Sequence, residues 1–129
     1  MKKLIAVLVI SVLALTACGS GGGEVKNLGV IAFSQKVADK SIIRLDVRTP
    51  NEFASGHLDG AINIDWESGH FEADINALDK SKSYAVYCRS GNRSGQATSL
   101  MVHDGFKTVY NLKGGVADWV MNGLALVTN

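Results

Sequence analysis

The chain has 129 residues, of which 47% are apolar and 19% are charged, and its formal net charge is +1 at pH 7. This length leaves room for one domain of ordinary size, and the composition is that of a globular protein with a conventional core. It excludes a disordered tail and a disulfide-rich miniprotein. The near-neutral charge, with no basic block after Lys3, argues against a nucleic-acid-binding protein.

The first residues have the pattern of a signal peptide. Lys2 and Lys3 are followed by an almost wholly apolar run, Leu4–Ala17. As a helix this run would span about 20 Å, whereas the hydrocarbon core of a bilayer is roughly 30 Å thick, which disfavours a permanent transmembrane helix. We therefore expect residues 1–17 to direct export and then to be removed.

The run ends in Leu15-Thr16-Ala17-Cys18, which resembles the lipobox of bacterial lipoproteins. The resemblance implies cleavage before Cys18 and acylation of this residue, which would anchor the chain to a bacterial membrane facing the periplasm or the cell surface. An ordinary secreted protein with a free Cys18 is the alternative. The Gly/Ser-rich residues 18–24 would form a flexible tether, and residues 25–129 the folded domain.

The number of cysteines makes Cys88 conspicuous. If Cys18 carries lipid, Cys88 is the one cysteine left in the sequence, so no internal disulfide can form. An unpaired thiol in an oxidising compartment is open to oxidation, so its presence calls either for deep burial or for a use.

The predicted domain alternates strands and helices. Runs rich in β-branched and aromatic residues predict four strands, at Ser41–Val47, Ala61–Ile64, Tyr84–Cys88 and Thr108–Leu112. A short edge strand around Leu28–Ile31 is expected before a helical turn that starts at Ser34. These strands would make a mainly parallel, five-stranded sheet.

Helix signals lie between the strands. Thr49 is a good N-cap, with Pro50 at the first helical position and Gly56 after the end. Three further helices are expected at Phe71–Leu78, Gly91–His103 and Val116–Met121. The alternation predicts an α/β domain with helices on both faces of the sheet.

The segment that follows the third strand is suited to chemistry. Ligands bind at the carboxyl ends of strands in such sheets, and Cys88 ends a strand shortly before a helix begins. Gly91 can take a positive φ angle, so the loop can curl around the thiol. Inward N–H groups, the helix dipole, Arg89 and Arg93 would stabilise a thiolate and an oxyanion.

Three segments resemble signatures of the rhodanese family, in the family's order. They are the loop Cys88-Arg89-Ser90-Gly91-Asn92-Arg93-Ser94, an upstream signature with Leu45-Asp46-Val47-Arg48, Glu52-Phe53 and Gly56-His57, and a downstream one with Leu112-Lys113-Gly114-Gly115 and Trp119. The similarity spans residues 25–127. It implies a rhodanese-like α/β fold and the transfer of sulfane sulfur from a donor such as thiosulfate to cyanide or a thiol.

The resemblance also assigns roles. Cys88 would be the catalytic nucleophile and carry sulfur as a persulfide. The loop from Arg89 to Ser94, including Ser90, Gly91 and Asn92, would bind the persulfide and the substrate, with Arg89 and Arg93 on the sulfonate. Arg93 could also hold the shape of the loop. No cofactor is expected, and His70 and His103 lack the spacing of metal ligands.

Three other residues are interpreted as structural. Asp46 and Arg48 are expected to pair with neighbouring groups or to cap the strand end, and His57 to stabilise a turn through a hydrogen bond. Leu58-Asp59 departs from the family pattern, which often has an apolar residue followed by Pro. Since Asp can also begin a turn, the departure concerns local rigidity and not chemistry.

Two alternative functions are left open. A cysteine phosphatase or an arsenate reductase would also bind an oxyanion over a thiolate. Four residues separate Cys88 from Arg93, whereas the related cell-cycle phosphatases carry a longer loop, so the length favours sulfur transfer. A non-catalytic lipoprotein that delivers persulfide sulfur or senses anions is the other alternative.

Overall fold

The computed structural model describes residues 23–129. The predicted signal peptide at 1–17, the acylation site Cys18 and most of the predicted tether lie outside the described residues. Among the helices between residues 23 and 129, none is long and apolar enough to cross a membrane.

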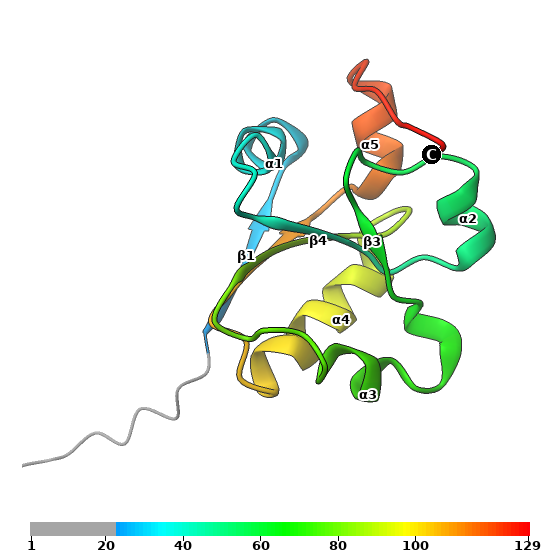
Figure 1. The fold of residues 1–129 in the computed structure, drawn as a ribbon. Coiled ribbons are helices and arrows are strands. Elements are labelled where there is room, and N and C mark those ends of the chain that lie inside the picture. Colours follow the sequence, from blue (N-terminus) through cyan, green and yellow to red (C-terminus); the bar gives the residue numbers. More distant parts are fainter. Residues whose placement is uncertain (1–22) are drawn as a thin grey trace, which may run out of the picture.

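The five strands form one parallel sheet (Figure 1). They are β1 (Glu24–Leu28), β2 (Ile43–Asp46), β3 (Ile62–Asn63), β4 (Ser83–Tyr87) and β5 (Thr108–Leu112). Their order across the sheet is β1-β5-β4-β2-β3, and every pair is parallel. The central strand β4 therefore ends next to Cys88, at the carboxyl edge where ligands bind in such sheets.

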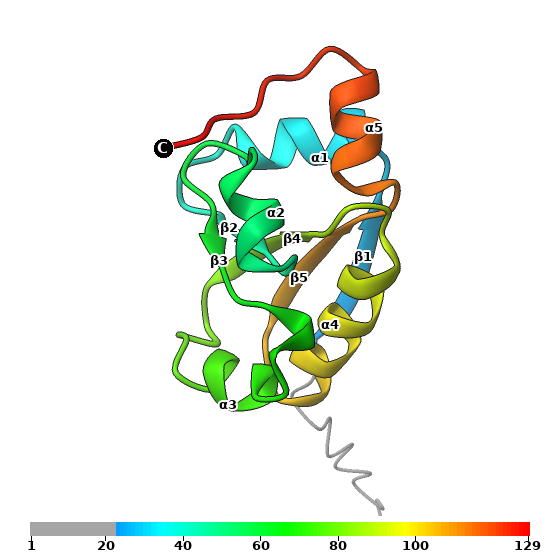
Figure 2. The same cartoon turned by 90° about the vertical axis from the view of Figure 1, so that its right-hand side faces the viewer.

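Helices cover both faces of the sheet (Figure 2). They are α1 (Val30–Val37), α2 (Pro50–Ala54), the 3-10 helix η1 (Trp66–Ser68), α3 (Phe71–Ile75), α4 (Asn92–His103) and α5 (Gly115–Met121). Helices α1 and α5 pack on one face, and α3 and α4 on the other. The expected α/β fold, with a five-stranded parallel sheet, is confirmed.

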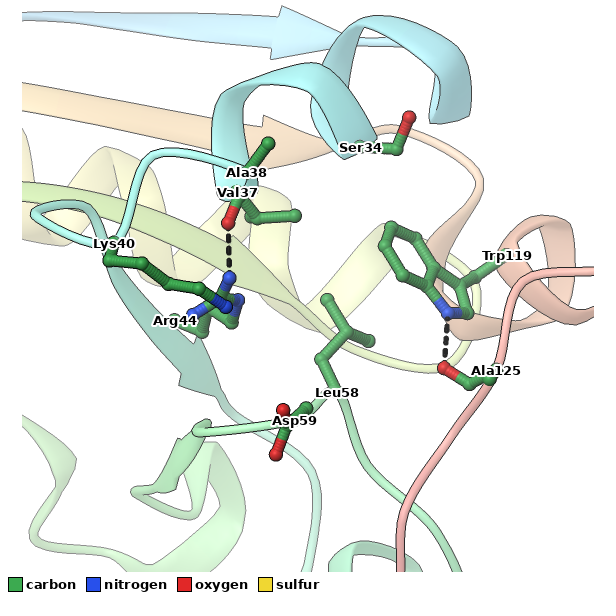
Figure 3. A pocket seen from close by; sticks show the side chains of 9 residues that line it. All are labelled: Ser34, Val37, Ala38, Lys40, Arg44, Leu58, Asp59, Trp119 and Ala125. Atoms are coloured by element: carbon green, nitrogen blue, oxygen red, sulfur yellow. Dashed lines mark hydrogen bonds between the residues drawn. The ribbon is translucent and has the colours of Figure 1, made fainter.

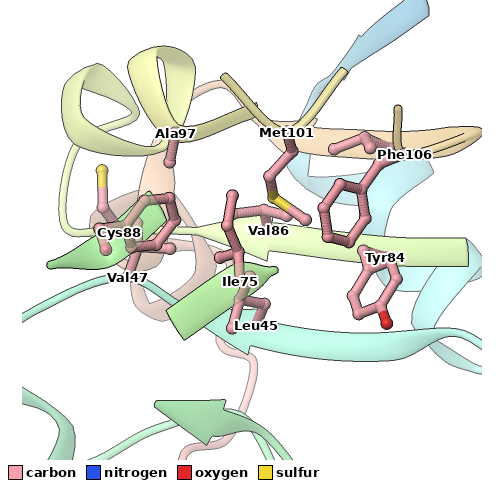
Figure 4. Packing of buried hydrophobic residues seen from close by; sticks show 11 residues of the cluster. Leu45, Val47, Ile75, Tyr84, Val86, Cys88, Ala97, Met101 and Phe106 are labelled. Atoms are coloured by element: carbon pink, nitrogen blue, oxygen red, sulfur yellow. The ribbon is translucent and has the colours of Figure 1, made fainter. Parts of the chain in front are cut away.

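Two apolar clusters hold these layers together. Side chains alternate along β4, so that Tyr84, Val86 and Cys88 face α3 and α4 whereas Ala85 and Tyr87 face α1 and α5. Figure 4 shows Cys88 within the first cluster, close to Ala97 of α4. Burying a large apolar side chain contributes about 1.5 to 3 kcal/mol, so the packing that stabilises the domain also fixes the backbone at Cys88.

The N-terminal elements differ from expectation. The edge strand is Glu24–Leu28, not residues around Leu28–Ile31, and α1 begins at Val30 instead of Ser34. The pairing of Glu24 to Leu28 with the whole of β5 decides the strand, and a local pattern does not show such long-range pairing. Glu24, assigned to the tether from the sequence, is thus the first residue of β1.

Other boundaries differ less. Helix α2 has the expected Thr49 cap, in which Thr49 Oγ1 accepts a hydrogen bond from the Glu52 N–H and Glu52 accepts one from the Thr49 N–H. Helix α3 ends at Ile75, not Leu78, because residues 76–78 continue as a turn. The 3-10 helix η1 was not expected; it begins at an Asp65 side chain that accepts from the Glu67 N–H.

Candidate active site

The loop after β4 curls back on its own cysteine. Gly91 takes φ +97° and is the N-cap of α4. A Cβ atom at this position would lie 1.9 Å from the Lys113 carbonyl oxygen, so a side chain is excluded by space as well as by φ. The predicted use of Gly91 for a tight turn is therefore what the backbone shows.

The amino end of α5 supports the loop from outside. The N–H groups of Val116 and Ala117 donate to the carbonyls of Cys88 and Arg89, at 2.8 and 3.0 Å. With these carbonyls bound on the outside, the following N–H groups can turn toward the thiol. This role was not predicted from the sequence; the signal for it was the Gly114-Gly115 pair between a strand and a helix.

Cys88 is buried at the start of the loop, with 1% of the residue exposed. The Gly91 N–H donates to Sγ at 3.1 Å, and Ser94 Oγ lies 3.4 Å from Sγ. Burial raises the pKa of the thiol, but hydrogen bonds from the Ser94 hydroxyl and from the N–H groups of Ser94, Ser90 and Gly91 outweigh burial and lower it below its ordinary value. The direction is the one expected from the sequence.

Arg93 is held by carboxylates from two other elements. Its Nη1 and Nη2 atoms lie 2.8 and 3.0 Å from Oε2 and Oε1 of Glu52, and Nη1 lies 3.3 Å from Oε2 of Glu67. The hydrogen bond with Arg93 is the main reason that the pKa of Glu52 falls to about 2. These contacts fit the loop-holding role expected of Arg93, whereas its contact with a sulfonate stays a prediction.

The other predicted loop residues are arranged differently around the thiol. Ser94 is buried beside Sγ, whereas Arg89, Ser90 and Asn92 are exposed. Asn92 Oδ1 accepts from Gln96 on the surface of α4. Within the described residues the Arg89 guanidinium has no ion-pair or hydrogen-bond partner, which leaves it available to an anion.

A buried polar network supports the segment between β2 and β3. Arg48 Nη2 lies 2.6 Å from Asp46 Oδ2 and also donates to the Gly56 carbonyl. Asp46 and Arg48 thus pair with each other, which agrees with the structural role expected of both residues. The hydrogen bond expected of His57 is confirmed, because its Nδ1 lies 2.8 Å from the Phe53 carbonyl oxygen. Leu58-Asp59 is the pair that departs from the family pattern. Leu58 is buried, and its N–H donates to the Tyr87 hydroxyl.

A cavity of about 210 Å³ lies on the opposite face of the sheet from the thiol (Figure 3). It is lined by Ser34, Val37, Ala38, Lys40, Arg44, Leu58, Asp59, Trp119 and Ala125. Its apolar wall belongs to the α1 and α5 layer, whereas Cys88 faces α4. The cavity is therefore separate from the loop. No cluster of His, Cys, Asp and Glu that could hold a metal occurs in the described part of the chain.

Comparison with known proteins identifies a family model and relatives that are similar to this chain. Residues 31–122 match the family model for the rhodanese-like domain. A sulfurtransferase of Allochromatium vinosum is 33% identical over 97 residues, which cover 74% of this chain and 89% of that protein. A thiosulfate sulfurtransferase of Shewanella oneidensis is 36% identical over 95 residues, which cover 73% of this chain and 91% of that protein.

Solved structures give the same result. A rhodanese-related protein from Thermoplasma volcanium superposes with a TM-score of 0.71 at 28% identity, over 81% of this chain and 99% of that one. A rhodanese-like domain from Anabaena superposes with a TM-score of 0.69 at 26% identity, over 80% of this chain and 79% of that one. Together with the loop around Cys88, these matches show that the chain belongs to the rhodanese-like family of sulfurtransferases.

Proposed function

We propose that the protein moves sulfane sulfur from thiosulfate, through a persulfide on Cys88, to a thiophilic acceptor. The observation that carries the proposal is the Cys88 thiol itself, which accepts the Gly91 N–H and lies beside the Ser94 hydroxyl. Both groups favour a thiolate, which is the nucleophilic form of cysteine. The thiosulfate sulfurtransferase of Shewanella oneidensis, similar over most of its length, supports this donor.

In the first step the Cys88 thiolate attacks the outer sulfur of thiosulfate. The new S–S bond forms as the bond between the two sulfur atoms of thiosulfate breaks, and sulfite leaves with the electron pair of that bond. Sulfite is a competent leaving group, so this step needs no general acid. The inward N–H groups of the loop, with the amino end of α4, stabilise the negative charge on the terminal sulfur of the persulfide.

In the second step an acceptor attacks that terminal sulfur. With cyanide the products are thiocyanate and the regenerated Cys88 thiolate; with a thiolate the product is an organic persulfide. The reaction is ping-pong, because sulfite leaves before the acceptor reacts. The buried position of Cys88 favours acceptors that are small or present their sulfur on a slender arm.

Arg89 is the proposed partner of the sulfonate, because its exposed guanidinium is unpaired among the described residues. Arg89→Ala should raise the KM for thiosulfate about ten-fold or more, since one charge-assisted hydrogen bond is worth roughly 1.5 to 3 kcal/mol. Lys36→Ala, which removes an exposed positive charge from α1, is the matched control. Thiocyanate formation at varied thiosulfate tests this, and an unchanged KM would remove Arg89 from the mechanism.

We also propose that the protein is exported and lipid-anchored through Cys18, facing the periplasm or the cell surface. Leu15-Thr16-Ala17-Cys18, after a short apolar run, supports this proposal. Cys18→Ala should shift the protein from the membrane fraction to the soluble fraction, or leave it unprocessed. Recovery of native protein with an unmodified Cys18 from cells would contradict the anchor.

A further inference from the structure

The carboxylate of Glu67 lies beside the catalytic loop although it belongs to a distant element. Its Oε2 atom is 3.3 Å from Arg93 Nη1, and the side chain is 56% exposed. The short helix η1 that carries it is fixed, because the Trp66 N–H donates to the Val47 carbonyl and the Trp66 ring packs on Phe71. The position of Glu67 is therefore set by the fold.

Glu67 is the second carboxylate on a single guanidinium. Glu52 already binds both terminal nitrogens of Arg93, with N–O distances of 2.8 and 3.0 Å. Because Glu52 alone balances the positive charge of Arg93, the negative charge of Glu67 is not balanced by Arg93. Arg93 and Cys88 interact electrostatically. The charges around Arg93 therefore also act on a donor that binds at the thiol.

The excess negative charge opposes the remaining cation of the loop. Arg89 is the second positive charge of the loop, and it is exposed. Donors of sulfane sulfur differ in charge, since thiosulfate carries two negative charges whereas a thiosulfonate or an organic persulfide carries one. Repulsion by a fixed carboxylate grows in proportion to the charge of the donor.

We propose that Glu67 is a specificity-determining residue that disfavours doubly charged donors relative to singly charged ones. The inference rests on the proposed function, because it concerns the donor of the same Cys88 persulfide. Glu67 acts through the field at the mouth of the loop and makes no bond to the donor. Glu52, in contrast, is tied to the α2 cap as well as to Arg93 and serves the structure of the loop.

The test compares two donors in Glu67→Gln, an exposed substitution that removes one charge. Thiosulfate and benzenethiosulfonate both transfer their outer sulfur, and sulfite or benzenesulfinate leaves. If each donor charge lies about 8 Å from the Glu67 carboxylate in a water-like dielectric, at low salt the KM for thiosulfate should fall about six-fold and that for benzenethiosulfonate about 2.5-fold. Both changes should shrink above roughly 0.15 M salt, where the Debye length is about 8 Å.

Glu24→Gln is the matched control. Glu24 is exposed and lies at the opposite end of the sheet from Cys88, so the same change in net charge should leave both KM values unaltered. In Glu67→Gln, kcat should also stay within two-fold of wild type at a pH where Cys88 is fully thiolate. A loosened loop would lower kcat with both donors.

The outcomes separate the two proposals. The role of Glu67 would be overturned if Glu67→Gln changed both KM values equally or changed neither. It would also be overturned if Glu24→Gln produced the same change. None of these results would contradict sulfur transfer itself. Failure of the wild-type protein to accept sulfur from either donor would overturn the proposed function, and the inference with it. A larger KM change for thiosulfate, lost at high salt, supports the inference.

Discussion

The N–H group of Val116 donates to the carbonyl oxygen of Cys88 at 2.8 Å. A residue on the helix after β5 thus holds the backbone of the nucleophile at the end of β4. The contact turns the Cys88 carbonyl outward and leaves the following N–H groups free to face Sγ. The reactivity of the thiol therefore depends on how closely α5 approaches the loop.

This close approach predicts the effect of Gly115→Ala. Gly115 has φ +64°, and a Cβ atom there would lie 2.3 Å from the Arg89 carbonyl oxygen. The substitution should displace α5, lower the rate of persulfide formation by more than ten-fold and destabilise the fold by about 1 to 3 kcal/mol. Urea denaturation and a single-turnover assay with thiosulfate measure the two effects.

Gly123→Ala is the matched control, since Gly123 also has a positive φ, +75°, but no atom lies within 4 Å of its Cβ position. It should cost about 1 kcal/mol for backbone strain and leave the rate of persulfide formation unchanged. Equal losses of rate in the two variants would show that positive φ alone, and not the contact with Arg89, explains the result.

Ser94→Ala tests the hydrogen bond to the thiol. Ser94 is buried, and its hydroxyl is the leading cause that lowers the pKa of Cys88. Without it the pKa should rise, so alkylation by iodoacetamide should slow several-fold at mildly acidic pH and approach the wild-type rate as the pH is raised and both thiols ionise. Ser99→Ala, on the exposed side of α4, should leave this profile unaltered. A Ser94→Ala profile that superposes on wild type would exclude the hydroxyl as a stabiliser of the thiolate.

Glu52→Gln tests the link between the loop and α2 through pH. The pKa of Glu52 is lowered from 4.5 to about 2, so the carboxylate stabilises the fold fully above about pH 4.5 and loses this effect as the pH falls through about 2. The variant should be less stable than wild type by about 1 kcal/mol at pH 7, after allowance for solvent screening. In urea titrations, the difference in free energy of unfolding between wild type and Glu52→Gln should narrow between pH 4.5 and pH 2. If that difference is constant across this range, the variant loses stability through the α2 cap and not through the charge.

The local signals in the sequence predicted most of the fold. Two elements predicted correctly are β5, from the β-branched run at Thr108–Leu112, and α2, from its Thr49-Pro50 start. Each is encoded by a few neighbouring residues. The sequence pattern misplaced the strand at Glu24–Leu28 because this strand is stabilised by β5, more than 80 residues away. One such contact is the hydrogen bond that the Asn111 side chain donates to the Asn27 side chain.

The site was predicted to a similar extent. Cys88, Gly91 and Ser94 meet as expected, since they lie within one loop. The partners of Arg93 could not be predicted, because Glu52 and Glu67 are 41 and 26 residues distant and are brought together only by the order of the strands. The support from Val116 and Ala117 was missed for the same reason, since backbone groups carry no side-chain signature.

Intact-mass spectrometry can show whether Cys88 carries sulfur. Protein with the lipid segment removed, beginning at Gly23 so that β1 is retained, is exposed to thiosulfate and measured before and after cyanide. We expect a gain of one sulfur atom on Cys88, its loss to cyanide with release of thiocyanate, and no gain in Cys88→Ser. An unmodified wild-type mass after thiosulfate, or the same gain of sulfur in Cys88→Ser, would contradict it.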